Sequence, residues 1–119
     1  MRRTLALALL PCALLAAGCG SGDDDTTAGI DPNDQRALAL ACLTKEKKLP
    51  AKELPPDSIQ VGDAAGGPRI RFFTNSGEAE AEQFEGNGEG AEHIGRALLF
   101  VRDGSDDLLK EVEDCLSDL

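Results

Sequence analysis

The chain lacks tryptophan and tyrosine, and it has only four phenylalanines and one histidine among its 119 residues. With so few aromatic side chains, its core must be small and mainly aliphatic. Glycosidases pair two carboxylates in clefts that carry aromatic platforms, so the glutamates between residues 78 and 92 indicate a solvated helix face instead. His93 has no second histidine for a metal site and no nucleophile motif beside it. We therefore expect no catalytic residue, no metal and no cofactor.

Basic residues are also scarce. The chain has 12 Lys and Arg against 22 Asp and Glu, and its formal net charge is −10. This balance argues against nucleic acid as a partner, because phosphates require a basic surface. It argues equally against electrostatic binding to anionic lipids. A glycine-rich phosphate loop is lacking too, since Gly62, Gly66 and Gly67 join two predicted strands and lead into no helix.

Long hydrophobic runs are lacking except for one near the beginning of the chain. Residues 4–17 form an apolar run, interrupted by Pro11, after the positive start Met1-Arg2-Arg3. The run is shorter than the roughly 20 residues that a transmembrane helix needs. It ends in small residues, as a secretory signal does. Export from the cytoplasm is the first prediction.

The run ends in Leu15-Ala16-Ala17-Gly18-Cys19, which resembles the lipobox of bacterial lipoproteins. Ala16 departs from the pattern, because leucine is commoner three residues before the cysteine. The resemblance implies that residues 1–18 are a signal peptide that is removed and that Cys19 receives the lipid. The protein would then be held on a cell membrane or envelope, facing away from the cytoplasm. A plain secretory signal without lipidation is the alternative.

Two further segments follow the signal. Residues 19–30 are polar, carry the adjacent acids Asp23, Asp24 and Asp25, and contain only one apolar side chain larger than alanine, at the end of the segment. This composition is typical of a disordered acidic tether. Residues 31–119 have the length and pattern of one small globular domain.

The pattern within this domain predicts a small α+β fold of order α-β-β-α-β-α. The expected elements are a helix over 32–44 or as far as 47, strands over 58–61 and 69–74, a helix over 76–85, a strand over 97–101 extended backwards over 94–96, and a helix over 106–119 capped by Ser105. We expect a three-stranded mixed sheet, with the third strand parallel to the second. Prolines 50, 55 and 56 predict an irregular connection, and Phe84 is the expected anchor of the second helix.

If Cys12 is removed and Cys19 is lipidated, only Cys42 and Cys115 remain in an oxidising compartment. Each lies on a predicted helix, so we expect a structural disulfide with the two Cα atoms within about 7 Å. Buried free thiols, a redox pair and metal thiolates are alternatives. The chain lacks both the Cys-x-x-Cys spacing and the four ligands that the last two usually require.

One predicted strand places Arg69, Arg71 and Phe73 on a single face. This face is a candidate surface for an envelope protein partner; local pairing of the arginines with glutamates is the alternative. No residue indicates a small-molecule ligand. We therefore expect a membrane-anchored envelope lipoprotein that acts as a non-catalytic binding or accessory module. The alternative is a small envelope enzyme or thiol-redox protein that uses Cys42 and Cys115, or His93 with nearby carboxylates.

Overall fold

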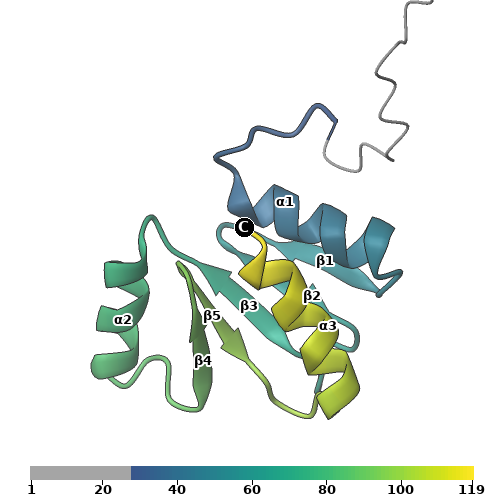
Figure 1. The fold of residues 1–119 in the computed structure, drawn as a ribbon. Coiled ribbons are helices and arrows are strands. Elements are labelled where there is room, and N and C mark those ends of the chain that lie inside the picture. Colours follow the sequence, from purple (N-terminus) through teal and green to yellow (C-terminus); the bar gives the residue numbers. More distant parts are fainter. Residues whose placement is uncertain (1–27) are drawn as a thin grey trace, which may run out of the picture.

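The computed structural model describes residues 28–119 (Figure 1). The predicted signal peptide, Cys19 and most of the predicted tether lie outside these residues. The described part is a small α+β domain, as expected. Its elements in chain order are α1 (Gln35–Ala41), the π-helical turn η1 (Cys42–Glu46), β1 (Ala51–Leu54), β2 (Ser58–Val61), β3 (Arg69–Phe72), α2 (Ser76–Phe84), β4 (Ala91–Ile94), β5 (Ala97–Phe100) and α3 (Asp106–Ser117).

The sheet has five strands in the order β1-β2-β3-β5-β4, and every neighbouring pair is antiparallel. The expectation of a three-stranded mixed sheet is therefore wrong. The chain leaves β3, passes through α2 and enters β4, which runs in the same direction as β3. It then reverses at Gly95, whose φ of +58° suits glycine, and β5 fills the place between β3 and β4. Of the residues expected to extend β5 backwards, Ile94 is the last residue of β4, and residues 95 and 96 form this turn.

The prolines do not prevent a strand. β1 occupies the four residues between Pro50 and Pro55, at the edge of the sheet, where it pairs with β2 alone. An edge strand tolerates flanking prolines because one side of its backbone has no partner strand. The predicted irregular connection is thus a fifth strand with prolines at its two ends.

One face of the sheet is covered by α1 and α3, which lie side by side across it (Figure 1). The core between these layers is mainly aliphatic, as the composition predicted. It consists of Ala39, Leu43, Ile59, Val61, Ile70, Phe72, Ala97, Leu99, Val112, Cys115 and Leu116. The predicted cap of α3 is confirmed, because the Ser105 hydroxyl accepts a hydrogen bond from the Leu108 amide. Helix α1 starts at Gln35, three residues later than expected, with Asp34 as its cap.

Helix α2 lies on the opposite face of the sheet, over β5 and β4. Its Glu82 pairs with Arg71, which alternates with the core residues Ile70 and Phe72 along β3. The expectation that Phe84 anchors α2 is wrong, because this side chain is 86% exposed. Ala79, fully buried, takes that role. The helix is capped by the preceding Asn75.

Candidate functional site

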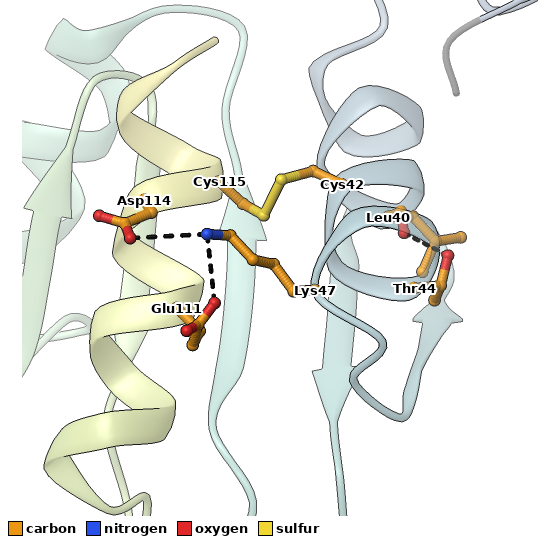
Figure 2. The surroundings of a disulfide bond; sticks show 7 residues. All are labelled: Leu40, Cys42, Thr44, Lys47, Glu111, Asp114 and Cys115. Atoms are coloured by element: carbon orange, nitrogen blue, oxygen red, sulfur yellow. Dashed lines mark hydrogen bonds and ion pairs between the residues drawn. A yellow bond between two sulfur atoms is a disulfide. The ribbon is translucent and has the colours of Figure 1, made fainter. Parts of the chain in front are cut away.

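The predicted pairing of the two cysteines is confirmed. Cys42 and Cys115 form a disulfide with 5.8 Å between their Cα atoms, and it joins the start of η1 to α3 across 73 residues (Figure 2). Both sulfurs are therefore engaged with each other. A thiol-redox function would have to act through this bond.

Lys47, immediately after η1, reinforces the same junction. Its Nζ lies 3.2 Å from Glu111 and 3.6 Å from Asp114 on α3 (Figure 2). The hydrogen bond to Glu111 is the main cause of the raised pKa of Lys47. The two ends of the π-helical turn are thus attached to one helix, one covalently and one by ion pairs.

His93 lies on β4, away from the cysteines. The residue is exposed, and its Nε2 atom lies 2.8 Å from the Gly95 carbonyl oxygen. On the other face of the same strand, the one that α1 and α3 cover, Glu92 approaches Glu113 of α3. Desolvation raises the pKa of Glu92, and the hydrogen bond to Glu113 raises it further. Within residues 28–119 no group of three or more acidic, cysteine or histidine side chains is arranged to hold a metal ion.

Two of the three predicted contact residues are engaged locally. Arg71 Nε lies 3.1 Å from Asp57 Oδ2, and its Nη1 lies 3.4 Å from Glu82 Oε2. Its guanidinium carbon also stands 4.8 Å from the centre of the Phe73 ring, within cation–π range. The charge of Arg71 is therefore neutralised within the domain.

Arg96 has a structural role as well. Its Nη1 donates to the Thr74 carbonyl at 3.2 Å, and its Nη2 donates to the Asn33 carbonyl at 2.8 Å. These bonds fasten the segment before α1 to the connection between β3 and α2. Arg96 therefore contributes to the fold at the end of the sheet opposite Arg69.

Arg69 belongs to a different environment, defined by the register of the sheet. One line of paired residues crosses all five strands on the face away from α1 and α3. We name it the transverse row: Lys52, Gln60, Arg69, Phe100 and Ala91. The row brings a lysine, an arginine and a phenylalanine onto one side of the sheet.

Gln60 is the buried member of the transverse row. It is the one buried polar residue of the described domain and is fully inaccessible. Its Nε2 lies within 3.0–3.3 Å of four carbonyl oxygens, that of Val61 at the end of β2 and those of residues 63, 67 and 68 in the loop between β2 and β3. Its Oε1 accepts a hydrogen bond from Arg69 Nε at 3.1 Å. One side chain thus holds the loop and orients an arginine.

Arg102 binds the same loop from its solvent-exposed side. Its guanidinium donates to the carbonyls of Ala64, Ala65 and Gly67 at 2.7–3.1 Å. Carbonyl oxygens are dipoles, so these bonds fix the position of the guanidinium and leave its net positive charge in place.

A hollow of about 380 Å³ lies between these two arginines, lined by Arg69, Phe100 and Arg102. In residues 28–119, neither arginine forms an ion pair with a carboxylate, whereas Arg36 and Arg71 do. Arg96 forms none either, but its guanidinium lines no part of this hollow and donates to two backbone carbonyls at the other end of the sheet. A second hollow, of about 270 Å³, borders Lys52 and Gln60. The hollow of 380 Å³ is the candidate binding site, because it combines uncompensated positive charge with an accessible aromatic ring.

A third hollow, of about 340 Å³, lies at the other end of the transverse row. It is lined by Gln83, Phe84, Gly88, Glu89, Gly90 and Ala91. Ala91 is the cross-strand partner of Phe100, so this hollow is a neighbour of the candidate site on the same face.

Sequence reasoning identified Arg69 but missed Gln60, Phe100 and Arg102. Phe100 lies in the strand expected over 97–101, and only the antiparallel pairing of β3 with β5 sets it opposite Arg69. The one available signal was Arg102, a cation that directly follows the apolar run over residues 97–101. The exposed Phe84 was missed for the opposite reason, because it was expected to be buried.

No helix within residues 28–119 has the length and apolar character required to cross a bilayer. No protein-family model matches the chain, and neither a curated protein nor a solved structure shows significant similarity to it.

Proposed function

We propose that this protein is an envelope lipoprotein, anchored through a lipid on Cys19, whose domain is a non-catalytic binding module. Its contact surface is the hollow lined by Arg69, Phe100 and Arg102. The proposed partner is an envelope protein that offers carboxylates and an apolar group to this surface. No cofactor takes part.

The observation that carries the proposal is the uncompensated charge of two arginines in a protein with a net charge of −10. Carboxylates are abundant in this chain, yet Arg69 and Arg102 pair with none within residues 28–119. Arginines and aromatic side chains that line a hollow are the residue types that dominate binding energy at protein interfaces.

The site is also preorganised. Arg69 is held through Nε by Gln60, and Arg102 is held by three carbonyls of the loop. Side chains that are already ordered lose less conformational entropy when a partner binds. The buried hydrogen bonds of Gln60 therefore serve binding as well as folding.

The lipid anchor on Cys19 and the contact surface are tested separately. Cys19→Ser in the full-length chain should abolish lipid labelling and release the protein from the membrane fraction. Unchanged processing and labelling would rule out the lipid anchor and leave the contact surface to be judged alone.

For the surface, Phe100 is replaced by the photo-crosslinker p-benzoylphenylalanine in the full-length chain, expressed in its own envelope. The control carries the probe at the exposed Asp107 on α3. We expect adducts from position 100 that Arg69→Gln weakens, and none of the same mass from position 107. Identical adducts from both positions, or none from position 100, would contradict a specific contact here.

A further inference from the structure

We propose that the partner at this surface is a second copy of the chain, bound in a two-fold symmetric dimer. This inference rests on the proposed function, because it uses the same hollow and names its occupant. In the dimer, Phe84 of each copy enters the hollow lined by Arg69, Phe100 and Arg102 of the other. The proposal rests on the distribution of charged and aromatic side chains over the face of the sheet away from α1 and α3.

The first observation is the exposure of Phe84. It is the last residue of α2 and is 86% exposed, the most exposed large hydrophobic residue of the described domain. It lines a hollow of its own without filling it. An aromatic side chain left in solvent at the rim of a hollow is typical of a contact residue.

The second observation is the charge around Phe84. Glu80, Glu85 and Glu89 are all exposed near it on α2 and the following loop, and Glu89 lines the same hollow. We name Phe84 with these three glutamates the acidic half of the face. Arg69, Phe100 and Arg102 form the basic half. Each half carries one phenylalanine.

The two halves lie on the same face of the sheet and border each other. The hollow at Phe84 includes Ala91, and Ala91 pairs across the sheet with Phe100. A two-fold axis between the halves sets the acidic half of one copy on the basic half of the other, and the reverse contact forms at the same time. This is the self-complementary patch that a closed, isologous dimer requires.

The groups that meet at each of the two contacts attract one another. A phenylalanine ring fits between guanidinium groups and a second ring, where stacking and cation–π attraction both favour it. The glutamates beside it reach the arginines that have no carboxylate partner in their own copy. An anionic lipid surface fits only the basic half, because the adjacent acidic half repels it.

The first test uses the full-length chain in its own envelope, expressed as two copies with different epitope tags. One copy carries p-benzoylphenylalanine in place of Phe84. We expect a photo-adduct that contains both tags, with the crosslink mapped by mass spectrometry to residues at or beside Arg69, Phe100 and Arg102. A mixed adduct mapped to another face would overturn the proposal.

Charge reversal then tests the complementarity. Arg69→Glu should lower the yield of the mixed adduct by about tenfold, and so should Glu85→Lys combined with Glu89→Lys. The second variant is needed because Arg69→Glu also removes the hydrogen bond to Gln60. Lys110→Glu, on the exposed side of α3, is the matched control and should leave the yield unchanged.

Mixing the two reversed variants is decisive. Each repels itself, but one copy of each restores opposite charges at both contacts, so the mixed adduct should return to nearly the wild-type yield. Failure of this rescue would overturn the proposal. If Phe84 gives no adduct with a second copy while Phe100 crosslinks to another protein, the dimer is excluded and the proposed binding function stands. If neither position gives adducts, both proposals fail.

Discussion

Gln60 and Arg69 form a hydrogen-bonded pair in which a fully buried amide holds the guanidinium of a partly exposed neighbour on the next strand. The same amide lies within hydrogen-bond distance of four carbonyls, one at the end of β2 and three in the loop that follows it. The stability of this loop and the position of the candidate site therefore depend on one side chain.

Gln60→Leu should destabilise the domain by about 1–3 kcal/mol, because buried loop carbonyls lose their donor. Urea unfolding of the full-length chain measures the change. Lys52→Leu, at the exposed neighbouring position of the transverse row, is the control and should have little effect. Equal stability of Gln60→Leu and the wild type would mean that water satisfies the loop without Gln60.

Loss of the disulfide should be more costly. Replacing Cys42 and Cys115 together by serine reopens a loop of 73 residues, which corresponds to about 4 kcal/mol in the chain-entropy model. For a domain of this size, each kcal/mol lowers the melting temperature by roughly 4–8 °C. Calorimetry with and without reductant measures it. Two free thiols in protein purified from the envelope would show that the bond does not form there.

Substitutions at Arg69 and Arg71 should differ in their effects, one on binding and the other on stability, although the two residues lie two positions apart on one strand. Arg71→Met removes two partly exposed ion pairs and should lower stability by about 0.5–1 kcal/mol, with crosslinking from position 100 retained. Arg69→Met should reduce crosslinking more than stability. Thermal melts and adduct yields on both variants decide this, and the reverse pattern would move the contact surface to Arg71 and Phe73.

The contribution of Glu92 to the stability of the domain should fall as pH rises. Desolvation and Glu113 raise its pKa above the reference value of 4.5, so the folded state binds its proton more tightly than the unfolded state does. Its contribution is therefore most favourable below pH 4.5 and is lost as pH rises through the folded pKa. Glu92→Gln should be more stable than the wild type near neutral pH and lose this advantage in acid.

Urea unfolding at about pH 4 and about pH 7 compares these states. Glu80→Gln removes the same charge from an exposed site on α2 and serves as the control. If both variants respond to pH alike, the effect belongs to net charge and not to the contact between Glu92 and Glu113.

The sequence predicted best where one residue type decides the outcome. Two usable cysteines can pair in only one way, and Ser105 before an acidic first turn is a sufficient helix start. The sequence did not predict β1 and β4. Each of these strands has only four residues, Ala51–Leu54 and Ala91–Ile94, and mixes apolar with charged side chains. Missing β4 also removed the reversal that makes β5 antiparallel to β3.

The candidate site depends on that same reversal. Arg69 and Phe100 are 31 positions apart, and only the antiparallel register makes them neighbours. Phe84 shows a second limit: in a helix with few apolar residues, the sequence does not decide between Ala79 and Phe84 as the buried side. In the structure Ala79 is fully buried and Phe84 is 86% exposed.

The disulfide also determines how the domain bears mechanical load. With the proposed anchor at the amino-terminal side and a partner pulling on β3 and β5, tension enters through α1 and reaches Cys42. There it divides between the chain leading into η1 and the covalent branch to α3. The strands between these branches belong to a closed covalent ring, so two covalent paths share the tension on them, whereas α1 lies outside the ring and carries all of it.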